Sequence, residues 1–294
     1  MKQKEILNDK YYMKISDIFQ HKGWDIEDFD GSIFNRFCNR LAYLEKDEER
    51  DFILELTERY IWIRSNQYED KLLNVLNKML KSDWWQSIDK DKDIIFCPIK
   101  LNEDAAKAKS STFMLYLCRS IEASTLFKSK ICNDLSLIKD LDSNEIGCLL
   151  FVDDYIGSGR TFMELMNELN LSKCEYLNKI AILSIAAQEQ GIKNIKREYP
   201  KLNNFFIDEL LKKGISDYYS SKEVVKKKEM LKSINEQLKI RKDCLGFDNT
   251  EALISLVRTP NNTLPFFWSD GKRKDAPFAR NTRDELKPNE NGTI

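Results

Sequence analysis

The stretch Cys148-Leu149-Leu150-Phe151-Val152-Asp153-Asp154-Tyr155-Ile156-Gly157-Ser158-Gly159-Arg160-Thr161 decides how the chain is expected to fold. Its first five residues form an apolar run typical of strands that are buried on both faces of a sheet. A short loop with two glycines follows the acids, and a helical pattern runs from Thr161 to Leu169. Strand, tight loop and helix direct backbone N–H groups toward one point, so the stretch predicts an anion-binding loop.

Each residue type in this loop suits one part of a phosphorylated ligand. The two glycines let the backbone approach a phosphate without an intervening Cβ, and Ser158 and Thr161 offer hydroxyl donors. Asp153 and Asp154 repel a phosphate because like charges repel. We therefore expect them to contact a neutral part of the ligand, such as sugar hydroxyls, or a bound Mg²⁺.

Two common phosphate-binding motifs do not match. A Walker A loop requires glycine where Asp154 stands and lysine where Arg160 stands. The dinucleotide-binding fingerprint requires a third glycine where Phe162 stands. The loop therefore belongs to another class of phosphate site.

Apolar strand patterns alternate with helical patterns on both sides of this loop, which predicts an α/β fold whose parallel sheet is covered on both faces. A Pro-terminated run, Ile94–Ile99, is the first strand candidate, and helices are expected over Thr112–Ser120 and Gln188–Glu198. The other strand candidates are Ile146–Val152, Lys179–Ala186, Phe205–Ile207 and Ala252–Val257.

The whole chain divides by pattern into three parts. Residues 1–90 carry apolar residues at three- and four-residue steps and predict a helical N-terminal region that packs as a small bundle. The α/β domain is expected over residues 91–283, with a helical insertion at about 212–243. Residues 284–294 form a polar tail that we expect to fray.

The insertion is rich in lysine, with Lys226, Lys227 and Lys228 in succession. One interpretation is a solvated helix face, since runs of charge are often exposed surface. The other is a contact with nucleic acid, which would depend strongly on salt. The whole chain has a net charge of only −1, so it has no overall field that attracts nucleic acid or membrane.

Other features of the composition point to a cytoplasmic protein. The N-terminus, MKQKEILNDKYY, has no apolar core of the signal-peptide kind, and no apolar run reaches membrane-spanning length. Seven widely spaced cysteines argue against a disulfide framework and suit buried apolar positions. The single histidine, His21, lies outside the predicted sheet, where we expect a surface position rather than a catalytic role.

A polar and aromatic segment follows the last predicted strand. Asn261 and Asn262 stand beyond a strand end, where ligands collect in open parallel sheets. Their amides are able to read the edge of a base, with Phe267 or Trp268 stacked on it. Pro-Asn-Asn is equally a good turn sequence, and both interpretations stay open here.

The order of an apolar strand, two acids, two variable residues, small residues with a Ser-Gly pair, one variable residue and then Thr resembles the signature of type I phosphoribosyltransferases. Residues 153–161 match this signature without a gap. The resemblance implies the phosphoribosyltransferase type of parallel sheet. It also implies that Asp153 and Asp154 hold the 2′- and 3′-hydroxyls of ribose. The backbone of Tyr155, Ile156, Gly157, Ser158, Gly159 and Arg160, with the side chains of Ser158 and Thr161, would hold the 5′-phosphate.

The same family places a pyrophosphate loop after an earlier strand. Here Lys100, Lys109 and Ser110 follow the strand at Ile94–Ile99, although this segment departs from the usual short glycine-containing loop. A solvated lysine-rich loop is the alternative. The family also implies Mg²⁺ between pyrophosphate and ribose, indirectly near Asp153 and Asp154, and a reaction through an oxocarbenium-like state.

Residues 259–268, taken with the helical N-terminal region, resemble a phosphoribosyltransferase-like branch found in bacterial conflict systems, including retron-associated effectors. This resemblance implies an effector in antiviral defence that binds phosphoribosyl pyrophosphate or a nucleotide, with an enzymatic phosphoribosyl transfer or hydrolysis. The alternative is a non-catalytic module that senses a nucleotide and assembles with a reverse transcriptase–nucleic-acid complex. Under either hypothesis a homo-oligomer is a further expectation.

Overall fold

The computed structural model describes residues 7–27, 29–101, 109–120, 127–172, 174–240, 242–271 and 276–280. The chain forms two compact units, and each consists of segments that are distant in sequence. The helical unit comprises the described residues within 1–58, 229–244 and 265–294, and the sheet unit comprises those within 59–228 and 245–264.

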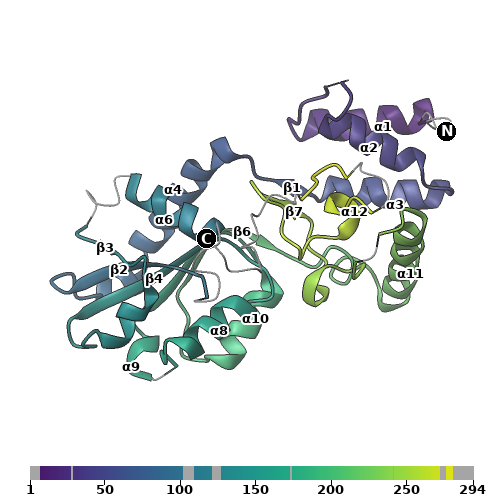
Figure 1. The fold of residues 1–294 in the computed structure, drawn as a ribbon. Coiled ribbons are helices and arrows are strands. Elements are labelled where there is room, and N and C mark those ends of the chain that lie inside the picture. Colours follow the sequence, from purple (N-terminus) through teal and green to yellow (C-terminus); the bar gives the residue numbers. More distant parts are fainter. Residues whose placement is uncertain are drawn as a thin grey trace, which may run out of the picture. The chain divides into compact units, whose positions relative to one another are not determined.

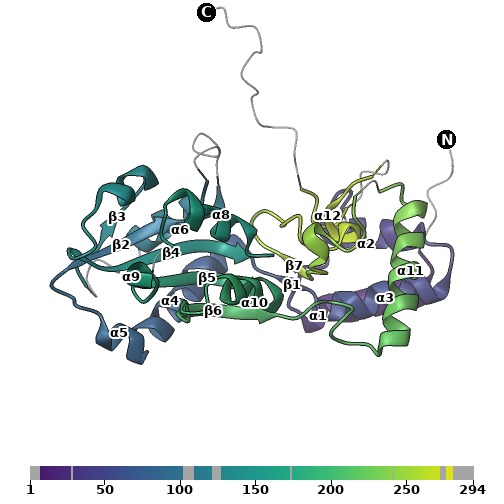
Figure 2. The same cartoon turned by 90° about the horizontal axis from the view of Figure 1, so that it is seen from below.

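A parallel sheet of five strands forms the centre of the sheet unit. Its strand order is β3-β2-β4-β5-β6, and every neighbouring pair is parallel. Figure 2 shows the strands side by side in this order. Every residue of β5 is buried, and its sequence is apolar except for Ser184 and Gln188, as expected of a strand that is covered on both faces. The strands span β2 Asp93–Pro98, β3 Lys130–Ile131, β4 Ile146–Ile156, β5 Ile180–Gln188 and β6 Phe205–Leu211.

Helices cover both faces of this sheet, as parallel strands require (Figure 1). Apolar residues of α4, α5 and α6 pack on one face, and apolar residues of α8, α9 and α10 pack on the other together with the 3₁₀ segment η3. The first group spans α4 Tyr68–Leu80, α5 Asp83–Ser87 and α6 Ser110–Ser120. The second group spans η3 Leu135–Asp140, α8 Arg160–Glu168, α9 Cys174–Leu177 and α10 Glu189–Glu198.

A second, two-stranded sheet lies within the same unit. Strand β1, Ile61–Trp62, pairs in parallel with β7, Ile254–Ser255. A buried hydrogen bond accompanies this pairing: the Tyr60 hydroxyl donates to Ser255 Oγ at 3.1 Å. The 3₁₀ segments η1, Ser65–Gln67, and η4, Phe247–Asn249, flank these strands in sequence.

The helical unit is held by an aromatic core. Phe19 lies in edge-to-face contact with Trp24, Phe34 and Phe37, at ring-centroid distances of 5.1, 5.1 and 5.5 Å. Two of its helices begin at side-chain caps, since Asn8 accepts from the Lys10 backbone N–H and Ser32 from that of Asn35. Its helices are α1 Asp9–His21, α2 Ile33–Ala42, α3 Asp47–Glu58, the last part of α11 Ser221–Gln237, and α12 Pro265–Trp268.

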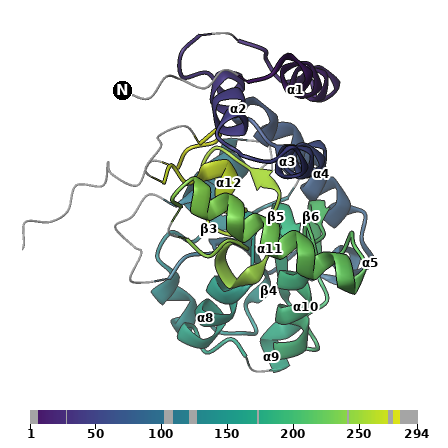
Figure 3. The same ribbon diagram turned by 90° about the vertical axis from the view of Figure 1, so that its right-hand side faces the viewer.

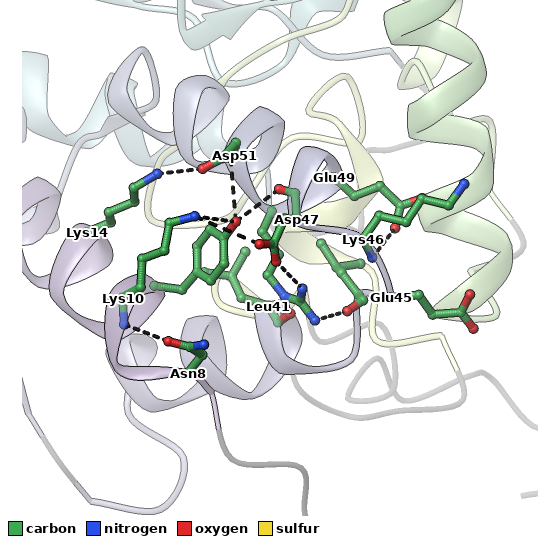
Figure 4. A network of polar contacts seen from close by, with 12 residues as sticks. Asn8, Lys10, Lys14, Leu41, Glu45, Lys46, Asp47, Glu49 and Asp51 are labelled. Atoms are coloured by element: carbon green, nitrogen blue, oxygen red, sulfur yellow. Dashed lines mark hydrogen bonds and ion pairs between the residues drawn. The ribbon is translucent and has the colours of Figure 1, made fainter.

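Ion pairs cross the surface between α1 and α3 (Figure 4). Lys14 Nζ lies 2.6 Å from Asp51 Oδ1, and the Tyr11 hydroxyl lies beside the same carboxylate. These helices also line a groove of about 690 Å³, whose lining includes His21. His21 is exposed, as the sequence predicts, and its Nδ1 contacts the Asp17 carbonyl oxygen of its own helix.

The α/β fold class is confirmed, and the strands at Ile94–Ile99, Ile146–Val152, Lys179–Ala186 and Phe205–Ile207 all occur. Three details differ. The strand expected at Ala252–Val257 is short and pairs with β1 outside the main sheet. Strand β4 continues through the two acids to Ile156, which shortens the loop. Strand β3 has only two residues, too few for a recognisable pattern.

The compact units divide the chain elsewhere than at residue 90. Residues 59–90 belong to the sheet unit, because the apolar side of α4 packs on the sheet rather than on the first helices. Within the expected insertion at 212–243, the helix is the continuous α11 (Figure 3), which begins in one unit and ends in the other. The tail at 284–294 lies outside the described residues. In the described part of the chain, no helix has the length and apolar character needed to span a bilayer.

Candidate functional site

Asp153 and Asp154 lie at the carboxyl end of β4, inside the strand. The normal alternation of side chains is interrupted here, because Val152 and Tyr155 belong to the same core cluster although they are three residues apart. As a result, both carboxyl groups contact helices that cover the same face of the sheet: Asp153 contacts α6 and Asp154 contacts α4. Two consecutive acids are thereby placed together at the strand end, where ligands bind in open parallel sheets.

Asp153 is held by the first residue of α6. The Ser110 hydroxyl donates to Asp153 Oδ1 at 2.7 Å, and the backbone N–H of Asp154 donates to the same oxygen at 2.9 Å. Burial raises the pKa of Asp153 well above its ordinary value, and the neighbouring Asp154 charge raises it further. Ser110, predicted as a pyrophosphate ligand, therefore lies beside the acid pair.

Asp154 is held by a residue that the sequence did not single out. Its side chain is 94% buried, at 6% exposure, and its Oδ2 accepts from the Tyr68 hydroxyl at 2.9 Å. Burial raises the pKa of Asp154, and hydrogen bonds from Ser110 and Tyr68 partly oppose that shift. Two adjacent carboxyl groups, of which Asp153 is half-buried and Asp154 is buried, are an unfavourable arrangement unless a proton, a cation or hydroxyl donors compensate them.

This donor set fits a magnesium ion that is shared with a substrate. Mg²⁺ is commonly bound by one or two carboxylates together with substrate phosphates, rather than by a cage made of protein alone. Across the residues that the structure describes, no cluster of three or more His, Cys, Asp or Glu side chains is arranged to hold a metal. Asp153 and Asp154 are therefore the residues that would face such an ion.

The loop after the acids depends on glycine for close packing. A Cβ at Gly157 would overlap the side-chain amide of Asn262. Gly159 has φ +82°, and a Cβ there would lie 2.8 Å from Ile195 Cγ1 and 2.9 Å from the Gly191 carbonyl oxygen. The loop backbone thus lies directly against α10, and the Asn194 side chain donates to the Ser158 carbonyl oxygen at 3.1 Å.

Helix α8 begins immediately after this loop. Its N-cap is Gly159 in the left-handed conformation, without a capping side chain. Its first two residues, Arg160 and Thr161, are exposed. The first N–H groups of a helix have no partner within it, so an uncapped and accessible N-terminus suits an anion.

The Arg160 and Asn262 side chains are held by the segment that precedes β7. Arg160 forms an ion pair with Asp248 at 2.7 Å, and its guanidinium stacks on Phe247. The Asn262 side chain lies against Gly157 and donates to the Phe247 carbonyl oxygen at 3.2 Å. The Asn261 carbonyl oxygen accepts from the Phe247 N–H. The turn interpretation of Asn261-Asn262 therefore describes their observed contacts, and base recognition stays a prediction.

The remaining predicted ligands lie in different places. Lys100 follows β2 and Lys109 precedes α6, both half-buried, whereas residues 102–108 between them lie outside the described residues. The side chains of Tyr155 and Ile156 are buried in the core, so only their backbone is suited to a ligand. Trp268 belongs to α12 of the helical unit and is buried there.

Sequence patterns gave no signal for several residues of this site. Tyr68 opens α4, more than eighty residues before the acids, and reads as an ordinary apolar position of that helix. Gly191 and Asn194 lie in α10, where the pattern is that of an amphipathic surface helix. Only folding brings these residues beside residues 153–159.

The parallel sheet, the adjacent acid pair at the end of β4 and the glycine loop before an uncapped helix define a phosphoribosyltransferase-like protein. Residues 26–280 match the family model PRTase-CE, and the chain belongs to that family. No curated protein sequence matches the chain. Among solved structures, the AQ2163 protein from Aquifex aeolicus is similar at 10% sequence identity, and the match covers 64% of this chain and 87% of that one. Its TM-score of 0.31 is too low to establish a shared fold.

Proposed function

We propose that the sheet unit binds a ribose 5-phosphate group, with phosphoribosyl pyrophosphate as the expected ligand. The observation that carries this proposal is the pair Asp153 and Asp154, held by Ser110 and Tyr68, directly before the loop that ends at an uncapped helix. A ligand with neutral hydroxyls at one end and a phosphate at the other matches both parts. Membership of the PRTase-CE family supports the same ligand class.

In this binding mode the two carboxyl groups accept hydrogen bonds from the 2′- and 3′-hydroxyls. The N–H groups of residues 157–161 and the Thr161 hydroxyl hold the 5′-phosphate at the start of α8. Arg160 contributes its backbone, because its guanidinium is paired with Asp248. Lys100, just after β2, and Lys109, just before α6, are the proposed partners of the pyrophosphate and act as point charges.

The proposed reaction breaks the bond between C1′ of ribose and the pyrophosphate oxygen. A base nitrogen or a water molecule then forms the new bond to C1′, and pyrophosphate leaves with the electron pair. Mg²⁺, when bound, stabilises negative charge on the leaving pyrophosphate. The chain's own contribution is to hold the ribose through Asp153 and Asp154, so that the oxocarbenium-like carbon develops in a fixed position.

For the biological role we propose an effector in bacterial antiviral defence, on the strength of the sequence resemblance of residues 259–268. The alternative is a non-catalytic sensor that assembles with a reverse transcriptase–nucleic-acid complex, or as a homo-oligomer. Contacts between lysines of α11 and residues outside that helix weaken the case for a basic, nucleic-acid-binding surface on α11. Lys228 pairs with the buried Glu251 at 2.7 Å, and Lys227 lies over the Tyr219 ring at 5.1 Å.

The test replaces both acids by their isosteric amides, Asp153→Asn with Asp154→Asn, and measures phosphoribosyl pyrophosphate binding by calorimetry with Mg²⁺ present. Loss of two charge-assisted hydrogen bonds is expected to weaken binding by about a hundredfold or more. Release of pyrophosphate is followed in parallel, so that binding without turnover identifies the sensor alternative.

The matched control is Asp93→Asn, at the opposite end of the strands, where the carboxylate pairs with exposed Lys130. This variant should bind as the unchanged protein does. An unchanged affinity in the doubly substituted protein, with circular dichroism showing an intact fold, would refute the ribose assignment.

A further inference from the structure

We propose that Tyr68 is a positioning residue for ribose recognition: its hydroxyl fixes one oxygen of Asp154 and thereby sets the orientation of the carboxyl group toward the sugar. The inference rests on the proposed function for its ligand, and it adds a residue from α4 that the loop signature does not contain.

The contact is short and enclosed. The Tyr68 hydroxyl lies 2.9 Å from Asp154 Oδ2, and its side chain is only 1% exposed. A hydrogen bond to a carboxylate in a buried place is stronger than its equivalent in water. The orientation of Asp154 is therefore tied to the position of Tyr68.

The direction of this hydrogen bond is determined by a third group. The backbone N–H of Val257 donates to the Tyr68 oxygen at 3.1 Å. A phenol has one proton, and an N–H cannot accept it, so the proton of Tyr68 is left to point at Asp154.

Tyr68 itself is held by the helix that it begins. Leu72, Val75, Leu76 and Met79 of α4 are buried in the core on one face of the sheet. Residues at three- and four-residue steps on one helix move together, so the packed side of α4 fixes where its first residue lies. The sheet core thereby supports the carboxyl group through a helix rather than through β4 alone.

A partly exposed aromatic ring lies on the outer side of this arrangement. Phe113 of α6 packs against the Tyr68 ring at a centroid distance of 5.7 Å and is 41% exposed. Exclusion of water beside the hydroxyl–carboxylate contact increases the strength of that contact. The same helix supplies Ser110 to Asp153, so the two acids are each held by a helix of this face.

The experiment removes only the hydroxyl, with Tyr68→Phe, and compares three probes: phosphoribosyl pyrophosphate, ribose 5-phosphate and inorganic pyrophosphate. Affinity for the two ribose ligands should fall by about tenfold, because the Asp154 carboxyl group must then be oriented at the expense of binding free energy. Affinity for inorganic pyrophosphate should stay unchanged, because that probe has no hydroxyls for Asp154. A general structural defect would weaken all three.

Tyr60→Phe is the matched control, since it also removes one buried tyrosine hydroxyl of the sheet unit, there bonded to Ser255. It should leave all three affinities unchanged. In a chain that already carries Asp154→Asn, Tyr68→Phe should cause less than a twofold further loss. A full tenfold loss in that background would show that Tyr68 acts by another route and would overturn the proposal.

A ligand-free measurement separates this inference from the proposed function. In crystals of Tyr68→Phe protein without ligand, the Asp154 side chain should occupy a new rotamer or more than one. A single unchanged rotamer would overturn the positioning role. If the unchanged protein binds no ribose ligand, the ribose assignment fails while the rotamer result still decides whether Tyr68 holds Asp154.

Discussion

The two compact units use ion pairs of nearly equal length in different surroundings. In the sheet unit, Lys228 Nζ lies 2.7 Å from Glu251, whose side chain is 0% exposed. In the helical unit, Lys14 Nζ lies 2.6 Å from Asp51, and these side chains are 44% and 47% exposed. Water screens the second pair and is excluded from the carboxylate of the first, so distance alone does not rank them.

The carboxylate of Glu251 is also surrounded by further donors. It accepts from the backbone N–H groups of Ile215 and Ser216 at 3.1 and 2.6 Å, and from the Ser216 hydroxyl at 2.6 Å. Burial by itself raises the pKa of Glu251, but the hydrogen bonds from Lys228 and Ser216 outweigh it, and the net pKa is lowered. Through these contacts the Glu251 carboxylate, in the segment before β7, holds residues 215–216 and Lys228 of α11 together.

We expect the largest effect from Glu251→Ala, which leaves Lys228 and two N–H groups without their acceptor. Removing one partner of a buried pair typically costs about 3–5 kcal/mol of unfolding free energy. Urea unfolding at neutral pH measures it. A loss below about 1 kcal/mol would place this pair with the exposed ones and remove the contrast between the units.

The same residue gives a pH dependence with a definite sign. The pKa of Glu251 is lower in the folded than in the unfolded chain, so its stabilisation is present above the unfolded pKa and is lost as the pH falls through the folded pKa. The difference in stability between the unchanged protein and Glu251→Gln should therefore shrink below about pH 4.5.

A second comparison between the units uses glycine. Gly159 and Gly23 both have positive φ, +82° and +62°, but a Cβ at Gly23 would meet nothing within 4 Å. Gly23→Ala should cost about 1 kcal/mol through backbone strain alone. Gly159→Ala adds overlap with Ile195 and with the Gly191 backbone, so about 2–4 kcal/mol is expected in total.

Urea unfolding compares the two glycine variants, and calorimetry with ribose 5-phosphate tests the loop, which is the proposed site of the 5′-phosphate. Only Gly159→Ala should lose affinity, because the loop must shift to admit the Cβ. Equal destabilisation by both substitutions would mean that φ, and not packing against α10, determines the need for glycine at the loop.

The smallest effect is expected at the exposed pair. The hydrogen bond from Lys14 lowers the pKa of Asp51, but exposed pairs contribute only about 0.2–1 kcal/mol. A double-mutant cycle of Lys14→Ala and Asp51→Ala should give a coupling in that range, reduced further in 1 M salt. A coupling that salt leaves unchanged would indicate that the contacts in Figure 4 are enclosed rather than solvated.

Residues 148–161 show how far the sequence could predict the site. The apolar run, the acids, the glycines and the following helix are local features, and each is present at the predicted place. The end of the strand was misplaced, because Asp153 and Asp154 look like loop residues until their helical partners are known. The ion pair between Lys228 and Glu251 could not be predicted either. A run of lysines in the sequence does not show which lysine pairs with a buried carboxylate and which remains exposed.

The sequence by itself determined the alternation of strands and helices, and with it the parallel sheet and the phosphate-loop candidate. These follow from periodicity and from backbone requirements that neighbouring residues satisfy among themselves. Only the tertiary structure decided that α4 covers the sheet, that Tyr68 meets Asp154 and that three distant segments form the helical unit. These contacts depend on which apolar surfaces pack together between segments that are distant in sequence. Such packing produces no pattern in the local sequence from which it could be predicted.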